Sequence, residues 1–261
     1  MDANSPIITA GNRGLRYGDG LFETMKCSKG RIVHFPEHMQ RLREGAQSLL
    51  LEIPKLHTNA FFEEQIISLL EKNKHQDFGR IRFSLFRANG GLYDPEHHRP
   101  NWLIETFKLS DIYNEWNVNG WHLCVSDASR KSADAFSQFK HNNFLPYIIG
   151  ALEAQKQKCK DAVILNASGN VCDTTVANIF IIKNERIYTP PISDGCVAGI
   201  QRAQLLKLLP GMGYPVEEKT LSASDLNDAD EIFVSNSRSE EHTSELQSHS
   251  DLVCRLLLEK K

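Results

Sequence analysis

The 261-residue sequence lacks any long apolar run. No window approaches the roughly 18 consecutive apolar residues that a membrane-spanning helix needs. The N-terminal segment Met1–Pro6 has no basic region followed by an apolar core, so it does not show the pattern of a secretory signal. We therefore predict a cytoplasmic protein that has no membrane partner.

Concentrated positive charge is missing as well. The formal net charge is −3, and no dense Lys/Arg run is interleaved with aromatic residues. Binding to a polyanion depends on such a basic surface. We therefore expect no nucleic-acid partner.

The cysteines are scattered, and none belongs to a C-x-x-C motif. Clustered Cys and His at zinc-ligand spacing would indicate a metal site, and the sequence does not show this pattern. We predict no metal, and free thiols in a reducing cytosol explain the cysteines better than a disulfide framework does. The cysteines are Cys27, Cys124, Cys159, Cys172, Cys196 and Cys254.

The sequence does have the composition of an ordinary globular protein. Hydrophobic residues make up 41% and charged residues 24%, values that lie near the averages for globular domains. The length exceeds the roughly 100–150 residues of a typical domain, so we expect two domains. The polar stretch 111–120 has no hydrophobic period and is the expected linker between an N-terminal α/β domain (1–110) and a C-terminal domain (121–237).

Strand and helix patterns are mixed along the chain, which predicts an α/β fold. In the first half, a helix is expected to begin at Pro36, because apolar residues then recur near a 3.6-residue period. In the second half, Asn184-Glu185 separates two strands and is the expected turn of a hairpin. Other expected strands are 31–35, 80–87, 102–107, 122–125, 162–165 and 231–235, and other expected helices are 59–72, 143–158 and one beginning at 200.

The last stretch, Arg238–Lys261, resembles the translation of a sequencing-library adapter. The nucleotides of the adapter encode Arg238–Ser248 in one frame, and after a short index its continuation encodes Leu252–Leu258. The alternative is a natural polar tail that ends in a short amphipathic helix around 252–258. We interpret 238–261 as a non-native tail and assign it no part in the fold or the function.

Lys140 is a candidate nucleophile. It lies where an extended segment meets a helix, between Phe139 and the run His141–Leu145. A lysine taken alone is usually a solvated surface amine. In an apolar setting at the end of a regular element, however, a lysine has a lowered pKa and can attack an aldehyde carbon.

The segment Gly195–Arg202 places two glycines directly before an amphipathic helix. Exposed backbone amides and the positive end of the helix dipole bind phosphate well at such a junction. The same pattern is also common in loops that bind nothing. The segment is therefore a candidate phosphate site that needs support from other residues.

Six short motifs follow one another along the chain. They are Arg13–Thr24 (RGLRYGDGLFET), His38–Leu42, Lys140-x-x-Asn143-x-Leu145, Asp173–Phe180 (DTTVANIF), Gly199–Arg202 and Phe233–Ser237. In sequence and in order they resemble the class IV, fold type IV family of pyridoxal 5'-phosphate (PLP) enzymes. The match spans essentially Arg13–Ser237, and the shared order makes chance agreement implausible.

The resemblance implies a two-domain fold similar to that of D-amino-acid aminotransferase. PLP is then expected in the cleft between the domains, with Lys140 and the phosphate site supplied by the C-terminal domain. Members of this family are usually homodimers, so we expect a homodimer by analogy.

The resemblance also implies roles in chemistry. Lys140 corresponds to the lysine that forms a Schiff base with PLP and shuttles protons to and from the substrate. Asp173 corresponds to the carboxylate beside the pyridine nitrogen. Arg87 is a candidate contact for a substrate carboxylate, and a structural salt bridge is an equally good interpretation of this arginine.

Phosphate binding is assigned in the same way. Arg41 corresponds to the arginine that binds the PLP phosphate, with an ion pair on the helix surface as the alternative. Gly199 and the amides of Ile200 and Gln201 correspond to the backbone part of the phosphate site. Ser237 corresponds to a hydroxyl that contacts the same phosphate.

The chain departs from the family pattern in three places. Asp173 stands where Glu is common, and the shorter side chain requires a shift of about an ångström, although a carboxylate can still keep the pyridine nitrogen protonated. Gln201 replaces a frequent Thr, which removes a hydroxyl and leaves the amide. The third departure is the tail, which begins where the last active-site strand is expected to continue.

The resemblance implies an enzyme that acts on a small amino substrate. One activity is that of 4-amino-4-deoxychorismate lyases, which release pyruvate and form p-aminobenzoate for folate synthesis. The alternative is transamination of branched-chain or D-amino acids. The compact length and the absence of a glycine pair after Lys140 favour the lyase. A non-catalytic PLP-binding or metabolite-binding protein is the remaining interpretation, which Asp173 and the tail motivate.

Overall fold

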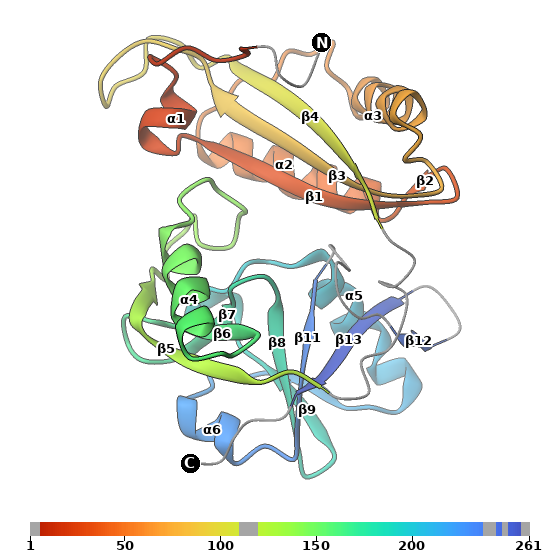
Figure 1. Cartoon of the computed structure of the whole chain (residues 1–261), viewed down its shortest axis with the longest axis vertical. Coiled ribbons are helices and arrows are strands. Elements are labelled where there is room, and N and C mark those ends of the chain that lie inside the picture. The colour runs from red at the N-terminus through yellow and green to blue at the C-terminus, as the bar shows by residue number, and fades with distance from the viewer. Residues whose placement is uncertain (1–5, 110–119, 237–243, 247–249, 257–261) are drawn as a thin grey trace. The chain divides into compact units, whose positions relative to one another are not determined.

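The computed structural model describes residues 6–109, 120–236, 244–246 and 250–256. The chain divides into two compact units (Figure 1). The first comprises Met1–Lys108 and Phe139–Asn143, and the second comprises Leu109–Gln138 and Phe144–Lys261. The predicted linker, 111–120, lies outside the described residues except for its last position.

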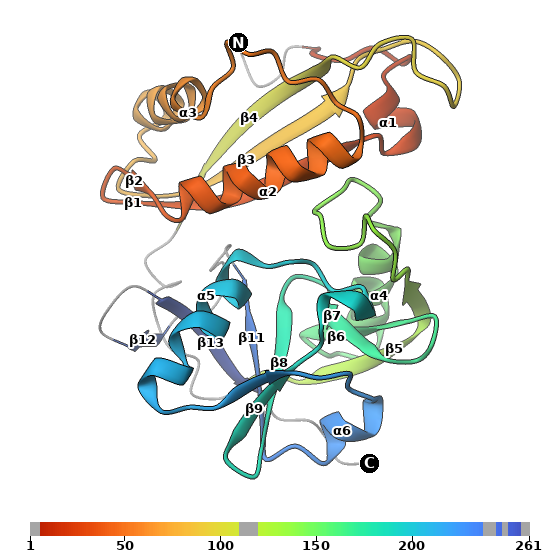
Figure 2. The same cartoon turned by 180° about the vertical axis from the view of Figure 1, so that it is seen from behind.

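The first unit is built on an antiparallel four-stranded sheet in the order β2-β1-β3-β4. Successive side chains of a strand point to opposite faces. On one face the apolar side chains of β1 and β3 form a core with the helices α2 and α3, and α2 lies in front of the sheet in Figure 2. The elements are α1 (Arg13–Tyr17), β1 (Gly20–Ser28), β2 (Arg31–Ile32), α2 (Phe35–Ser48), α3 (Asn59–Asn73), β3 (Phe78–Arg87) and β4 (Pro100–Lys108).

The start of α2 shows how the local sequence determines where a strand ends and a helix begins. Pro36 occupies the first turn of the helix, as predicted. The strand expected at 31–35 is wrong in length, since β2 ends at Ile32. His34 takes a left-handed conformation with φ 52°, and Phe35 already belongs to the helix. The backbone therefore turns before an extended run can form.

The second unit contains a six-stranded sheet, β10-β9-β8-β11-β13-β12, and a three-stranded sheet, β5-β6-β7. Its helix α4 packs on β5 and β6. None of the described helices in either unit is long and apolar enough to cross a membrane. The elements are β5 (Leu123–Lys131), α4 (Leu145–Lys156), β6 (Asp161–Asn166), β7 (Val171–Thr174), β8 (Asn178–Lys183), β9 (Arg186–Thr189), η2 (Ile192–Asp194), α5 (Ile200–Leu208), η3 (Pro210–Met212), β10 (Val216–Glu218), α6 (Ala223–Asn227), β11 (Glu231–Ser235), β12 (Ser244–Leu246) and β13 (Ser250–Leu256).

The predicted hairpin is confirmed. The strands β8 and β9 pair antiparallel, with Lys183 opposite Arg186. Asn184 and Glu185 between them have φ values of 50° and 60°. Two consecutive positive φ values are what a type I′ turn requires, and this turn matches the twist of the two strands.

The tail, to which the sequence analysis assigned no part in the fold, contributes two strands to the larger sheet. The backbone of Ser250–Leu256 forms β13 and pairs antiparallel with β11. The described part of 252–258 is therefore extended. The helix that the natural-tail alternative would allow is not formed there. Pairing with β11 satisfies backbone hydrogen-bonding groups that a short isolated helix would leave exposed.

Candidate functional site

The backbone of Lys140 is attached to the start of β1. The Phe22 amide donates to the Lys140 carbonyl (2.8 Å), and the Asn142 amide donates to the Gly20 carbonyl (3.0 Å). These contacts explain why Phe139–Asn143 groups with the first unit. The resemblance implied instead that the C-terminal domain supplies Lys140.

The side chain of Lys140 is half-buried beside an aromatic ring. Its Nζ atom lies 5.0 Å from the centroid of the Phe22 ring. The guanidinium carbon of Arg82 lies 3.9 Å from the same centroid. Two cationic side chains therefore share one aromatic platform, which attracts positive charge through its π-electrons.

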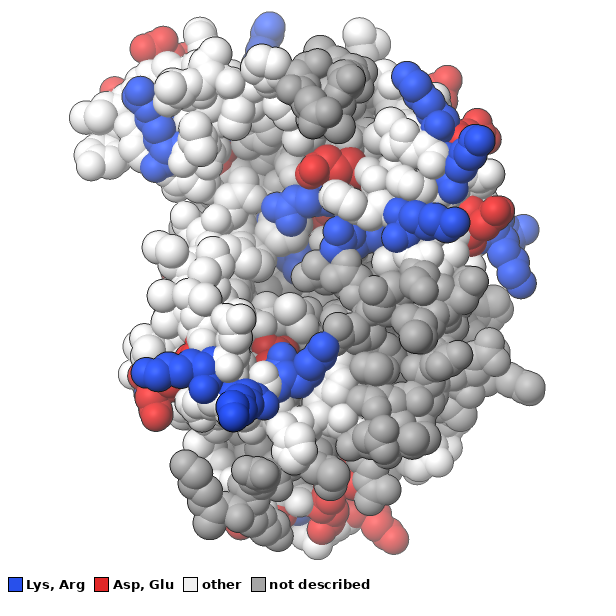
Figure 3. Space-filling view, viewed as in Figure 1, with Lys and Arg blue, Asp and Glu red and all other residues white. Residues whose placement is uncertain are grey.

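Further cations lie on the same face of the sheet as the Phe22 ring. Lys26 and Arg80 are opposite each other in the β1–β3 register, and Arg82 follows two residues further along β3. Lys26 lies over the Phe78 ring (4.9 Å) and Arg80 over the Phe107 ring (4.2 Å). Figure 3 shows basic side chains along this sheet, with some acidic ones among them. This face is suited to bind an anionic ligand.

The opposite face of β1 carries a buried ion pair with α2. Arg41 donates through Nε to Glu23 Oε1 (2.8 Å) and through Nη2 to Oε2 (2.6 Å). The Nδ1 atom of His38 lies 2.6 Å from Oε2 of the same carboxylate. Each of the three side chains is at most 7% exposed. The sequence motifs contain these residues, yet only Arg41 was predicted to act in the site.

The charges of this cluster are fixed near neutral pH. Burial by itself would raise the pKa of Glu23, but the Arg41 charge and the His38 hydrogen bond outweigh it and lower the pKa from 4.5 to about 2. Burial lowers the pKa of His38, so this ring donates from Nδ1 as a neutral imidazole. A guanidinium has five N–H donors, so the two-point contact orients Arg41 without using all of them.

Asp173 forms the centre of a second buried cluster. It lies on β7, and its Oδ2 atom accepts hydrogen bonds from Lys131 Nζ (3.3 Å), Tyr147 Oη (3.1 Å) and the Val197 amide (3.0 Å). Its Oδ1 atom is buried and has no hydrogen-bond partner among the described residues. Lys131 and Tyr147 were missed by the sequence reasoning, because neither belongs to a motif.

The predicted phosphate site lies at the first turn of α5. Gly199 is the N-cap residue and supplies no side-chain cap. A Cβ atom at Gly199 would collide with the side chain of Asn178, which donates from Nδ2 to the Val197 carbonyl (2.8 Å). The amides of Ile200 and Gln201 belong to the first turn, where helical N–H groups have no acceptor within the helix and commonly bind anions.

Two other predicted residues have different outcomes. Ser237 lies outside the described residues. Arg87 is 5% exposed and donates to Asp19 Oδ2 (2.8 Å) and to the Leu49 carbonyl (2.5 Å). These contacts favour the structural salt bridge over a role in binding substrate.

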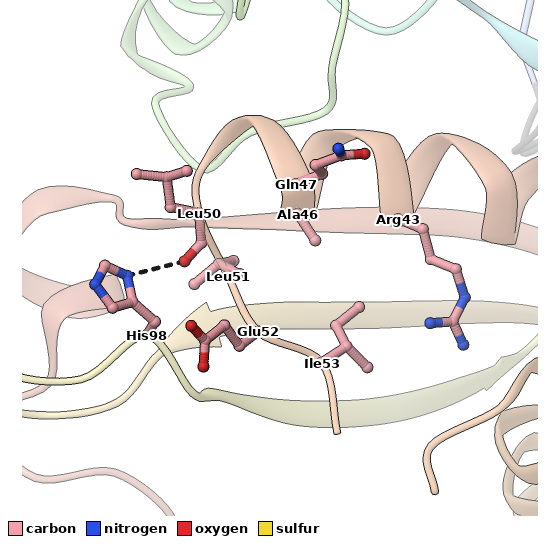
Figure 4. A pocket seen from close by; sticks show the side chains of 8 residues that line it. All are labelled: Arg43, Ala46, Gln47, Leu50, Leu51, Glu52, Ile53 and His98. Carbon is pink, nitrogen blue, oxygen red and sulfur yellow. Dashed lines mark hydrogen bonds between the residues drawn. The ribbon is translucent and has the colours of Figure 1, made fainter. Parts of the chain in front are cut away.

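A cavity of about 460 Å³ lies beside the C-terminal end of α2 (Figure 4). The Leu50 carbonyl at this cavity lies 3.0 Å from Nδ1 of His98. The cavity is not lined by any residue predicted to bind PLP or substrate. It is lined by Arg43, Ala46, Gln47, Leu50, Leu51, Glu52, Ile53 and His98.

Comparison with known proteins decides the family. The family model described as "Amino-transferase class IV" matches residues 20–240, which is most of the chain. The chain belongs to the class IV aminotransferase family. Its enzymes use PLP in transamination or lyase reactions, so the predicted enzyme class and cofactor are confirmed.

Class IV relatives with both activities are similar over most of their length. Aminodeoxychorismate lyase of Vibrio harveyi is 30% identical, over 88% of this chain and 83% of the relative. A putative branched-chain-amino-acid aminotransferase of Methanocaldococcus jannaschii is 28% identical, over 92% and 82%. The solved structure of a putative 4-amino-4-deoxychorismate lyase from Legionella pneumophila has a TM-score of 0.83 at 27% identity, over 98% of this chain and 88% of that chain. The predicted fold type IV is therefore confirmed.

The residues of this class IV chain fit PLP. A buried carboxylate oxygen without a donor costs about 1–3 kcal/mol, and the pyridine N–H of the cofactor would supply the donor that Asp173 Oδ1 lacks. The first turn of α5 and the oriented guanidinium of Arg41 are both suited to a phosphate. The apolar surroundings of Lys140 include the Phe22 ring.

Replacing Glu23 tests the buried pair with Arg41. Glu23→Gln leaves the buried Arg41 charge without its carboxylate, so the free energy of unfolding at pH 7 should fall by roughly 3 kcal/mol. A carboxylate whose pKa is lowered on folding stabilises the protein above its ordinary pKa, and this contribution is lost as the pH falls through the lowered pKa. The advantage of the wild type should therefore shrink between pH 4.5 and about 2, as denaturant unfolding at several pH values can measure.

Glu105→Gln provides the matched control on the same sheet. Glu105 lies 3.9 Å from Arg82, and both side chains are at least 40% exposed. Its replacement should change the unfolding free energy by no more than about 0.5 kcal/mol. The same pH dependence in wild type and Glu23→Gln would contradict the assignment.

Proposed function

We propose that this class IV enzyme is a cytoplasmic 4-amino-4-deoxychorismate lyase, which releases pyruvate and p-aminobenzoate. The observation that carries the proposal is the row of cations beside Lys140, with Arg82 on the same Phe22 ring. The lyase substrate carries two carboxylates, whereas a branched-chain amino acid carries one. A basic surface next to the reactive amine suits the doubly charged substrate better.

The lyase from Vibrio harveyi supports this choice, since it is 30% identical over most of both chains. The resemblance of Lys140-x-x-Asn143-x-Leu145, without a glycine pair after the lysine, points the same way. The similarity to a putative branched-chain aminotransferase keeps transamination as the second candidate.

We propose roles toward PLP for the residues named above. Lys140 supplies the amine that reacts with the PLP aldehyde, and Asp173 accepts the hydrogen bond of the pyridine N–H. When bound, PLP supplies an electron sink for the negative charge that develops on the substrate carbon next to the amino group.

The phosphate of PLP is assigned to a separate set of donors. Arg41 supplies a guanidinium that Glu23 already orients. The amides of Ile200 and Gln201 bind at the start of α5, and Gly199 keeps this turn free of a side chain. Ser237 belongs to the proposed set by its place in the family motif.

Proton transfer is assigned to Nζ of Lys140. With PLP and substrate bound, this amine would accept the proton of the substrate carbon next to the amino group. The Phe22 ring borders this amine and limits the access of water from that side. The same atom would then donate this proton to the methylene carbon of the enolpyruvyl group as its C–O bond to the ring breaks, so that the group leaves as pyruvate.

Removal of the Lys140 amine tests the catalytic assignment. Lys140→Ala should reduce release of p-aminobenzoate and pyruvate roughly a thousandfold or more, because both the nucleophile and the base are lost. Borohydride treatment of the wild type with PLP should fix a pyridoxyl group on Lys140, as peptide mass spectrometry can show. Lys183→Ala, at an exposed ion pair with Asp228, should leave both results unchanged.

The products distinguish the two candidate activities. Transfer of an amino group from branched-chain or D-amino acids to a keto acid, without release of p-aminobenzoate, would refute the lyase and support a transaminase. A pyridoxyl group on another lysine, or on none, would refute the role of Lys140.

A second prediction concerns the charge of the substrate. Arg82→Met removes one cation from the Phe22 platform and should raise KM for the two-carboxylate substrate roughly tenfold, since a hydrogen bond to a charged group contributes about 1.5–3 kcal/mol. The kcat value should change less. Arg31→Met, an exposed change on β2 of the same sheet, is the control. Equal KM values in wild type and Arg82→Met would contradict the assignment.

We propose, in agreement with the resemblance, that the enzyme is a homodimer. One face of α4 is buried against β5 and β6, while the other face exposes four apolar side chains with 39% to 70% of their surface accessible. Their spacing places them on one side of the helix. Such a cluster on a protein surface marks an interaction site. The four residues are Leu145, Ile148, Ile149 and Leu152.

A charge within this cluster should separate the subunits. Ile148→Glu would place a carboxylate in the apolar contact, so light scattering should change from the mass of two chains to that of one. Leu56→Glu makes the same change at an isolated leucine that is 86% exposed, and should leave the mass unchanged. A wild type with the mass of one chain would refute the dimer.

A further inference from the structure

The two oxygens of Asp173 have unequal surroundings. Three donors from three separate segments converge on Oδ2, namely Lys131 at the end of β5, Tyr147 on α4 and the backbone of Val197 before α5. Oδ1 is equally buried and has none among the described residues. An arrangement of this kind restricts rotation of the carboxyl group and leaves one defined acceptor.

We propose that Lys131 is a positioning residue for the cofactor: together with Tyr147 and the Val197 amide it holds Oδ2 and presents Oδ1 as an acceptor to the ring nitrogen of PLP. The inference rests on the proposed PLP site, and it assigns a role to two side chains outside all of the sequence motifs.

The charge of Lys131 is the essential part of this cluster. Its side chain is 4% exposed, and Nζ also lies 5.1 Å from the centroid of the Tyr147 ring. A buried carboxylate without a nearby cation tends to bind a proton. A carboxyl group that carries a proton offers a donor where the ring N–H needs an acceptor. The ring nitrogen would then lose its proton, and PLP would become a weaker electron sink.

The other titratable groups near Asp173 do not supply this charge. Burial, followed by the charge of Asp173, raises the pKa of Tyr147 well above its usual value, so its hydroxyl remains a neutral donor. Burial also raises the pKa of Cys172, and it raises that of Cys196 to about 12, so both thiols stay neutral near pH 7. Among the described residues, Lys131 is therefore the cation that donates directly to Asp173.

Asp173 stands where the family motif commonly has Glu, so the donors to its side chain matter for how it meets the cofactor. A carboxyl group on a shorter side chain reaches the ring nitrogen only if its position and orientation are fixed. Three donors on one oxygen provide this restraint, because each has its own preferred direction. The competing interpretation is an internal ion pair that stabilises the second unit and has no effect on the cofactor.

Lys131→Met tests the proposal, because it keeps the length of the side chain and removes the charge. PLP labelled with 15N in the ring reports directly on protonation of the ring nitrogen in the loaded protein. In the wild type we expect the resonance of a protonated nitrogen. In Lys131→Met we expect a shift towards the unprotonated position and roughly tenfold weaker binding of PLP, as for the loss of a hydrogen bond to a charged group.

Two further variants separate positioning from simple stabilisation. Lys131→Arg keeps the charge and should restore the protonated resonance, whereas Lys183→Met, at an exposed ion pair, should change nothing. Should Lys131→Met fail to fold, Tyr147→Phe removes one donor to Oδ2 with little change in volume and should shift the same resonance in the same direction. Circular dichroism checks the folded state of each variant.

The outcomes distinguish this inference from the proposed function. A wild type that binds PLP on Lys140, with the same 15N resonance and PLP affinity in Lys131→Met or Tyr147→Phe, would overturn the positioning role alone. A wild type that binds no PLP would overturn both. A shift in Lys131→Met that Lys131→Arg reverses would support both.

Discussion

Each unit of this protein holds one buried carboxylate against one buried cation, and the proposed site depends on these two ion pairs. Glu23 fixes the guanidinium of Arg41 in the first unit. Lys131 fixes the carboxylate of Asp173 in the second. Breaking a buried pair by removing one partner is costly, because the remaining charge is left without water or counter-ion. The pairs therefore hold their members in place before any ligand binds.

The strand β1 contributes side chains both to the core of the first unit and to the proposed active site. Because side chains alternate along a strand, Phe22 and Glu23 point to opposite faces of the sheet. Glu23 meets Arg41 under the helix α2, whereas Phe22 supports the cations Arg82 and Lys140 on the opposite face. A shift of register by one residue would exchange the two faces and separate both groups.

The class IV fold supports transamination as well as lyase chemistry, so the fold does not decide the reaction. PLP stabilises the same kind of negative charge in both. The difference comes from the groups that bind the rest of the substrate. The cations on aromatic rings beside Lys140 are therefore more informative about the substrate than the two-unit architecture is.

The sequence by itself determined the α/β class, the hairpin at Asn184-Glu185 and the family motifs, because these depend on local periodicity, turn chemistry and order along the chain. It did not determine that Lys131 and Tyr147 meet Asp173, or that the segment of Lys140 pairs with β1. These contacts join positions between 26 and 118 residues apart, counting from Tyr147 to Asp173 and from Phe22 to Lys140. Only the tertiary structure brings such residues together, because burial and charge compensation act between neighbours in space, whatever their separation in sequence.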